Sequence, residues 1–372
     1  MNSVPKTSVP FPIPAFEKQD AVFPRAFGIL HDAIAAHAFP GASVAVTFKG
    51  RLVALKAVGR FTYDPRSPEI TVDTRFDLAS LSKAIATTSM AMVLYQGGFL
   101  DLDMPVVAAV PEFGTGDARR REVTVRMLLA HSSGLPAYEK LFLQARTPDQ
   151  LLSRAFLVPL AADPGTVAVY SDIGFIVLGV VLARLADERL DEFCYRHLPV
   201  LGMPDTLFNP PARCRASIPP TADDRTFRKR IIQGEVQDEN ASVLGGVAGH
   251  AGLFGPARDL AHFAHTMLLG GQPLILPETL SLFTRRESTP DGTSRALGWD
   301  TASQPSQSGK YFSPRSFGHL GYTGTSLWID PERQFSLTLL TNRTWPDSKN
   351  QAIKQVRPKF HDAIVEALQH EK

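Results

Sequence analysis

The pattern of apolar and polar positions predicts strands near both ends of this chain. Residues 42–59 contain two apolar runs on either side of Lys49-Gly50, a pattern that is typical of a β-hairpin. Residues 323–341 contain a second pair of apolar runs, which we expect to turn at residues 330–333. Runs this rich in apolar residues suit a sheet that is covered on at least one face.

Between and beyond these hairpins the sequence carries the signals of helices. The segment from Leu78 to Gly97 predicts a helix that stops at a glycine pair. Residues 173–186 are almost wholly apolar but too short to span a bilayer, which predicts a buried helix. Further helices are expected over residues 25–37, from Thr147 onwards, from Pro256 to 270 and over 348–369.

The order of these elements predicts an α+β fold, an α/β sandwich with one antiparallel sheet built from strands of both termini. Residues 1–24 are rich in proline and predict an extended arm. We expect residues 25–75 and 246–372 to form a sheet-containing lobe flanked by helices. Residues 76–245 would form an inserted, mostly helical lobe, with the active site between the two lobes.

Composition narrows the class of protein. The chain has 372 residues, 44% of them hydrophobic, and a formal net charge of +2, so it reads as a globular protein with no bias towards nucleic acid. No stretch approaches the length of a membrane span, and no signal peptide is visible. We therefore expect a cytoplasmic protein, or a periplasmic or secreted one if a signal was removed. Cys194 and Cys214 lack metal-ligand spacing and fit free thiols.

Ser80 and Lys83 form a Ser-x-x-Lys motif at the start of a predicted helix. Residues three apart share a helix face, so the amine can reach the hydroxyl and activate it as a nucleophile. The motif alone is weak, because Ser3 and Lys6 show the same spacing in the proline-rich arm. The competing interpretation is a capping serine and a surface lysine.

Two further elements strengthen the hypothesis. Tyr170 precedes the buried helix, and a phenol can relay a proton to a leaving group. Asp172 follows it and is equally explained as a helix N-cap. His319-Leu320-Gly321 precedes the C-terminal hairpin, where a glycine allows substrate to approach the backbone. A rival match, His250-Ala251-Gly252, also exists.

Other polar residues suggest structural roles. His262 and His265 lie one turn apart without a third ligand, so we predict no metal and no cofactor. Residues 238–240 either line the site or cap a turn, and the turn is favoured. His131 is expected to stabilise a Ser-Gly-Pro loop. The expected partner is a small-molecule substrate, and the sequence does not indicate an oligomeric state.

With these elements in this order, the chain resembles the penicillin-recognising serine hydrolases. This superfamily comprises class C β-lactamases, penicillin-binding proteins that act as D-alanyl-D-alanine carboxypeptidases, D-amino-acid peptidases and related esterases. The resemblance extends from about residue 25 to 369 and includes further similar stretches at residues 76–79, 128–136 and 251–260. It implies a β-lactamase/transpeptidase-like fold.

The resemblance also implies roles for individual residues. Ser80 would form an acyl-enzyme, and Lys83 would share its proton with Tyr170, the general base for acylation and the acid for the leaving group. The N–H groups of Ser80 and Tyr322 would form the oxyanion hole. His319 and Gly321 would take the Lys and second Gly places of the family's Lys-Thr-Gly element.

Two departures from the family pattern favour an ester or a small amide or peptide over a penicillin. His319 stands where a β-lactamase has a lysine, and a neutral imidazole attracts a carboxylate less. Asp172 stands where the family usually has asparagine, and it could pair with Lys83 and hold it charged. Two alternatives remain open: a true β-lactamase or D-alanyl-D-alanine carboxypeptidase, and a non-catalytic ligand binder.

Overall fold

A mostly antiparallel sheet unites the two ends of the chain. In the computed structural model, which describes residues 11–303 and 306–370, its strand order is β1-β3-β2-β12-β11-β10-β9. Only β1 and β3 run parallel. The predicted sheet from both termini is therefore confirmed. Its strands are β1 (Ile13–Pro14), β2 (Gly41–Phe48), β3 (Arg51–Gly59), β9 (Asp300–Thr301), β10 (Phe317–Leu320), β11 (Ser326–Asp330) and β12 (Phe335–Thr341).

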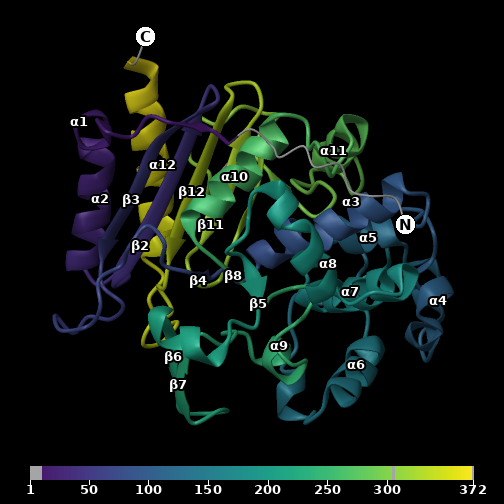
Figure 1. The fold of residues 1–372 in the computed structure, drawn as a ribbon. Helices are drawn as coiled ribbons and strands as arrows, with labels where there is room; N and C mark the ends of the chain where they lie inside the picture. The colour runs from purple at the N-terminus through teal and green to yellow at the C-terminus, as the bar shows by residue number, and fades with distance from the viewer. Residues whose placement is uncertain (1–10, 304–305, 371–372) are drawn as a thin grey trace.

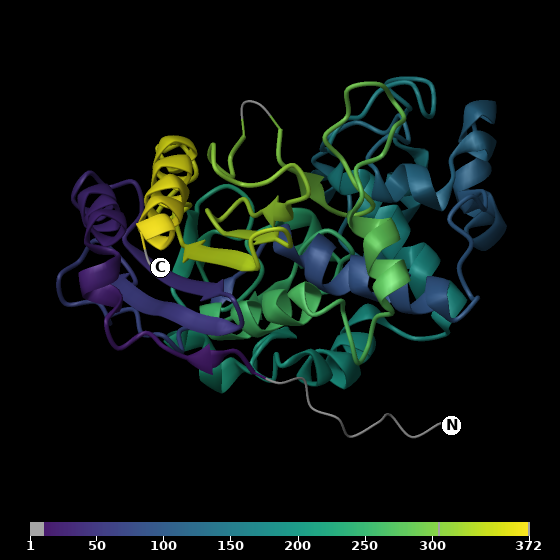
Figure 2. The ribbon, with the colours of Figure 1, turned by 90° about the horizontal axis from the view of Figure 1, so that it is seen from above.

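Helices cover both faces of this sheet (Figures 1 and 2). Helices α2 (Pro24–Ala35) and α12 (Ile353–His370) lie side by side on one face, where their apolar residues and those of the sheet form one buried cluster. Helix α10 (Ala257–Leu268) packs against β2 and β12 on the other face. Because both faces are covered, the central strands β2 and β12 are buried along nearly their whole length, including their serine and threonine side chains.

The chain between β3 and β9 is mainly helical, and most of it, apart from α10, forms a second body beside the sheet (Figure 1). It contains two smaller sheets, β4-β8-β5 and β6-β7. Their strands are β4 (Phe76–Asp77), β5 (Leu207–Phe208), β6 (Pro220–Asp224), β7 (Arg230–Gln233) and β8 (Leu253–Gly255). The helices are η1 (Lys83–Thr88, a π-helix), α3 (Ser89–Gln96), α4 (Val106–Ala109), α5 (Val125–Leu129), α6 (Pro148–Leu157), α7 (Asp172–Ala186), α8 (Leu190–His197), α9 (Glu239–Val243) and α11 (Pro277–Thr284).

Three details differ from the sequence predictions. Residues 19–22 form a helical turn, α1 (Gln19–Val22), within the expected extended arm, and residues 1–10 of that arm lie outside the described residues. The helix predicted from Leu78 begins only at residue 81, because the chain first makes a turn at Ala79. Ser171, not Asp172, is the N-cap of α7, since its hydroxyl accepts the N–H of Gly174.

Within the described ranges, no helix has the length and apolar character that crossing a membrane requires. The apolar helix α7 is buried against α3, α5 and α6, as its sequence predicts.

Candidate active site

Ser80 lies in a tight turn between β4 and the first helical turn. Ala79, directly before it, has a φ of 48°, a left-handed conformation that costs a non-glycine residue about 1–2 kcal/mol. The Asp77 carboxylate accepts the Ala79 N–H at 2.8 Å and stabilises this turn. Ser80 is partly exposed, whereas its neighbours Leu78 and Leu81 are fully buried. The turn therefore presents the Ser80 side chain at the surface of a rigid core.

Lys83 is fully buried at the start of the π-helix, and its three N–H bonds all have acceptors. Its Nζ lies 2.8 Å from Ser80 Oγ, 3.0 Å from the His250 carbonyl oxygen and 2.6 Å from Asp172 Oδ1. Burial lowers the pKa of Lys83, but the Asp172 carboxylate and the Tyr170 hydroxyl outweigh it and raise this pKa above its ordinary value. In the resting site Lys83 is an ammonium.

Tyr170, two residues before the start of α7, is the third member of the cluster with Ser80 and Lys83. Its hydroxyl hydrogen-bonds to both Ser80 and Lys83, and Lys83 Nζ lies 4.8 Å from its ring centroid. Burial raises the pKa of Tyr170, and the neighbouring Lys83 only partly offsets this. Tyr170 is therefore a neutral phenol that carries a proton beside Ser80. The structure brings the three predicted catalytic residues together.

Asp172 is the first residue of α7 and points its carboxylate at Lys83. The predicted ion pair is thus present. The side chain of Asp172 is 19% exposed, and that of Lys83 is fully buried. A carboxylate in the first turn is also favoured by the helix dipole. The pair leaves Lys83 protonated, so Lys83 must lose a proton before it can accept one.

The segment 319–322 lies beside Ser80 because the turn between β10 and β11 is hydrogen-bonded to the residues that precede Ser80. Thr323 Oγ1 donates to the Asp77 carbonyl at 2.8 Å, and Thr325 Oγ1 donates to the Leu78 carbonyl at 3.0 Å. A Cβ on Gly321 would meet Thr325 Oγ1 at 1.9 Å, so only glycine fits there. These hydrogen bonds thus join the turn before Ser80 to the turn between β10 and β11, which lies far from it in the sequence.

The oxyanion-hole hypothesis is compatible with this geometry. Tyr322 is half exposed, and its ring is covered on one face by the Arg343 guanidinium. Among the described residues, neither the Ser80 nor the Tyr322 backbone N–H has a hydrogen-bond acceptor. The N–H groups of Ser80 and Tyr322 are therefore free to donate to the oxygen of a tetrahedral intermediate, which needs two such donors.

His319 is a neutral residue in this site. Its Nδ1 lies 2.8 Å from the Leu320 carbonyl, which can only accept, so Nδ1 carries the proton. Burial and the charge of Lys83 lower the pKa of His319 to about 3. The ring centroid lies 5.8 Å from that of Tyr170. His319 therefore offers no positive charge to a substrate.

The rival histidine, His250, also belongs to the site, but through its backbone. Its carbonyl accepts from Lys83, and its Nε2 lies 2.8 Å from Asp238 Oδ1. Asp238 in turn caps α9, as the turn interpretation predicts, by accepting the Ala241 N–H at 2.7 Å. The sequence did not indicate this backbone role, because nothing in a sequence pattern marks a carbonyl as a ligand.

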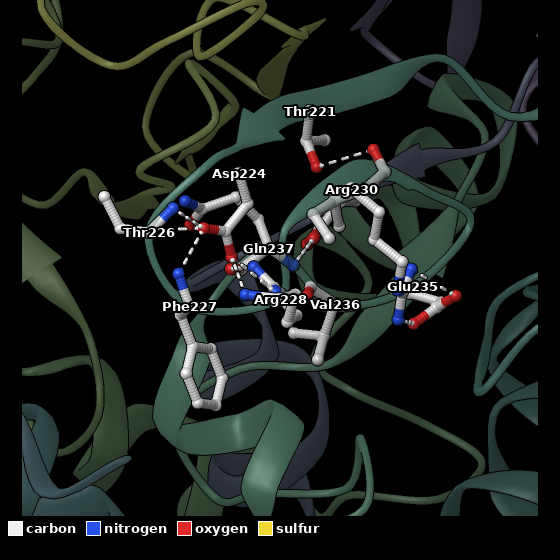
Figure 3. A network of polar contacts seen from close by, with 11 residues as sticks. Thr221, Asp224, Thr226, Phe227, Arg228, Arg230, Glu235, Val236 and Gln237 are labelled. Carbon is white, nitrogen blue, oxygen red and sulfur yellow. Dashed lines mark hydrogen bonds and ion pairs between the residues drawn. The ribbon is translucent and has the colours of Figure 1, made fainter. Parts of the chain in front are cut away.

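A polar network lies in the chain between β6 and α9 (Figure 3), and it continues to the turn before Ser80. Asp224 pairs with Arg228 at 3.0 Å, and both side chains are buried. The Arg228 guanidinium donates to the carbonyls of Val236 and Gln237 at 2.7 Å each. The Gln237 N–H then donates to Asp77 Oδ2 at 2.6 Å. The network therefore ends on the carboxylate that stabilises the turn before Ser80.

Two residues beside Tyr170 were not identified from the sequence. The His131 ring centroid lies 4.6 Å from that of Tyr170, so His131 does more than stabilise its own loop. The Arg295 guanidinium lies 5.3 Å from the same ring, and its nearest carboxylate is that of Asp300 at 3.7 Å. Within the described residues, no cluster of side chains suits a metal ion.

Comparison with known families agrees with this geometry. The family model described as Beta-lactamase matches residues 27–358. The chain belongs to the beta-lactamase family. It is a serine hydrolase with the fold of that family.

Curated relatives of this family member include two amide-bond enzymes by name. The "N-acetylmuramyl-L-alanine amidase" of Bacillus subtilis is 33% identical over 345 residues, which cover 82% of this chain and 77% of the relative. The "Putative D-alanyl-D-alanine carboxypeptidase" of Salmonella agona is 31% identical and covers 73% and 70%. Among solved structures, the hydrolase EstCE1 superposes with a TM-score of 0.76 at 22% identity, covering 93% of this chain and 98% of its own.

Proposed function

We propose that this serine hydrolase cleaves an amide bond of an N-acylated amino acid or short peptide, with Ser80 as the nucleophile. The observation that carries the proposal is the cluster in which Ser80 Oγ lies 2.8 Å from Lys83 Nζ and hydrogen-bonds to Tyr170. The choice of an amide is supported by the names of the two curated relatives, both of which refer to amide-bond hydrolysis.

The first step requires Lys83 as a neutral amine. A lysine of ordinary pKa loses its proton to water at pH 7 at a cost of about 5 kcal/mol, and the raised pKa of Lys83 makes this cost larger. The active form is therefore a minor species, with a neutral Lys83 beside the Asp172 carboxylate. The lone pair of Nζ then accepts the Ser80 proton as Oγ attacks the carbonyl carbon.

The remaining protons can be followed through the cluster. The carbonyl oxygen gains the negative charge, which the Ser80 and Tyr322 N–H groups stabilise. When the C–N bond breaks, Tyr170 gives its proton to the leaving nitrogen and recovers one from Lys83. The acyl group remains on Ser80, the amine departs, and Lys83 is again neutral. Water then attacks the ester, with the same groups acting in the reverse order.

The alternative activities fit the site less well. A penicillin carries a carboxylate, and the neutral His319 supplies no charge to attract it. A non-catalytic binder has no use for a buried lysine held against a partly exposed serine. EstCE1 resembles this chain in fold, at 22% identity. An ester is therefore a second substrate class, but no specific observation favours it over an amide.

The test is the Ser80→Ala variant assayed on N-acetylmuramyl-L-alanine amide, a substrate that carries no free carboxylate. We expect kcat/KM to fall by about 10³-fold or more, because the acyl-enzyme cannot form. In the wild-type protein, a fluorophosphonate probe should add its mass to the peptide that contains Ser80. Ser153→Ala, at an exposed position of α6, is the matched control and should keep full activity. Full activity of the Ser80→Ala variant on every amide and ester tried would refute the assignment.

A further inference from the structure

His131 makes two hydrogen bonds that lie on either side of Tyr170 in the sequence. Its carbonyl oxygen accepts the Val169 N–H at 2.9 Å, and its ring Nδ1 accepts the Ser171 N–H at 3.0 Å. The residue therefore holds the backbone directly before and directly after the phenol. Two bonds of this kind fix the direction in which the Tyr170 Cα–Cβ bond points.

The ring of His131 adds a third constraint. Its centroid lies 4.6 Å from the Tyr170 ring and 5.0 Å from the Phe175 ring, at interplanar angles of 42° and 31°. His131 is 3% exposed, so this packing excludes water from one face of the phenol. The ring thus restricts rotation of the Tyr170 side chain, which the backbone bonds alone cannot do.

The same loop anchors the next residues as well. Ser171 Oγ donates to the Pro136 carbonyl at 2.6 Å, and the Asp172 N–H donates to the Ala137 carbonyl at 2.9 Å. Residues 131–137 therefore hold the whole Tyr170-Ser171-Asp172 segment. His131 is the member of this loop that touches Tyr170 itself.

His131 cannot serve as a proton donor or acceptor in the reaction at ordinary pH. Its Nδ1 lone pair is occupied by the Ser171 N–H, so the neutral ring carries its proton on Nε2. Burial, with the nearby charges of Arg295 and Lys83, lowers the pKa of His131 well below its usual range. The contacts therefore stay the same across the working pH of an enzyme.

The backbone of His131 shows that this placement has a cost. Its φ is 58°, in the left-handed region, where a non-glycine residue loses about 1–2 kcal/mol. A glycine would avoid this strain but would supply neither the Nδ1 acceptor nor the ring. The strained histidine is consistent with a role that needs its side chain.

We propose that His131 is a positioning residue that holds Tyr170 in the geometry for protonating a leaving group, and that it thereby sets the preference of this site for amides over activated esters. The proposal rests on the proposed function, in which Tyr170 gives a proton to the departing nitrogen. An amine cannot leave without that proton, whereas p-nitrophenolate leaves as an anion. Misplacing Tyr170 therefore penalises amides selectively.

The experiment compares two variants on two substrates. His131→Ala removes both the acceptor and the ring, whereas His131→Asn keeps an acceptor where Nδ1 lies and tolerates a positive φ. Each variant is assayed on an N-acyl amino acid amide and on the p-nitrophenyl ester of the same acyl group. We expect His131→Ala to lose about 10²-fold or more in kcat/KM, which reports acylation alone, on the amide and only a few-fold on the ester, with His131→Asn between it and the wild type.

Controls separate this role from a structural one. His31→Ala, at an exposed position of α2, should leave both rates unchanged. A loss of equal size on both substrates in a folded His131→Asn protein, or no loss on either, would overturn the proposal. Tyr170→Phe should reproduce the selective loss on the amide. If Tyr170→Phe shows equal losses, the proposal also fails, and the fault lies with the acid role of Tyr170 in the proposed function.

Discussion

Three acceptors surround the amine of Lys83, and one of them is charged. Asp172 Oδ1 at 2.6 Å raises the pKa of Lys83 against the effect of burial. A raised pKa makes the neutral amine scarce below that pKa, so kcat/KM should increase with pH through neutrality. Asp172, one of the two residues that depart from the family pattern, is thus expected to set the pH range in which the protein works.

The variant Asp172→Asn tests this control of pH. Without the carboxylate, burial dominates and the pKa of Lys83 falls, so the neutral amine forms at lower pH. We expect the rising limb of the pH profile of kcat/KM to move down by about one pH unit or more. A profile measured from pH 5 to 10 on one amide substrate checks this, with Asp32→Asn on α2 as the control. An unshifted limb would show that Lys83 does not titrate as the base.

At the scale of elements, the turn between β10 and β11 places the Tyr322 N–H, the second donor beside the Ser80 N–H in the proposed oxyanion hole. Thr323 and Thr325 fasten it to the carbonyls of residues 77 and 78. The close approach is possible because Gly321 lacks a side chain, since a Cβ would lie 2.7 Å from the Leu78 carbonyl oxygen. The register of β10 against β11 then places the Tyr322 N–H.

A methyl group at this position should separate the two turns. We expect Gly321→Ala to lower kcat/KM by about 10²–10³-fold, the usual effect of losing one oxyanion donor. Labelling by a fluorophosphonate should slow in parallel, because its transition state uses the same donors. Gly28→Ala, in α2, is the matched control, since no atom lies within 4 Å of its added Cβ. Unchanged kinetics of Gly321→Ala would exclude the turn from the oxyanion hole.

At the scale of the whole molecule, a buried acid links the sheet-covering helix α10 to the rest of the chain. Asp259 accepts hydrogen bonds from the Asp205 N–H at 2.8 Å and from Thr206 Oγ1 at 2.9 Å. Burial raises the pKa of Asp259 from 3.8 to about 7. The folded state therefore favours the protonated acid, and this group stabilises the fold less as pH rises from about 4 to about 7.

Asp259→Asn should remove that dependence, because an amide oxygen can accept the same two hydrogen bonds without a charge. We expect the free energy of unfolding of the variant, relative to wild type, to be higher at pH 8 than at pH 4.5 by on the order of 2–4 kcal/mol. Urea denaturation at the two pH values measures this difference. If the variant and the wild type differ in free energy of unfolding by the same amount at both pH values, Asp259 ionises as freely in the folded protein as in the unfolded chain.

Local patterns were sufficient for the hairpin at residues 42–59 and the buried helix α7, and they offered the Ser80-Lys83 pair as a candidate beside Ser3 and Lys6. Strand alternation, helix periodicity and a three-residue spacing each depend on neighbours in the sequence. The order of these elements along the chain predicted the sheet from both termini. The resemblance to a family predicted the approach of Tyr170 and His319, which no local pattern shows.

Only the tertiary structure decided what surrounds these residues. The carbonyl of His250 on Lys83 and the contacts of His131 with residues 169–171 join segments about 40 to 170 positions apart. Such contacts depend on how the helices and turns pack, and backbone groups are the same at every position in a sequence. The sequence by itself therefore determined the fold and predicted Ser80 as the nucleophile, whereas packing determined the surroundings of Lys83 and the orientation of Tyr170.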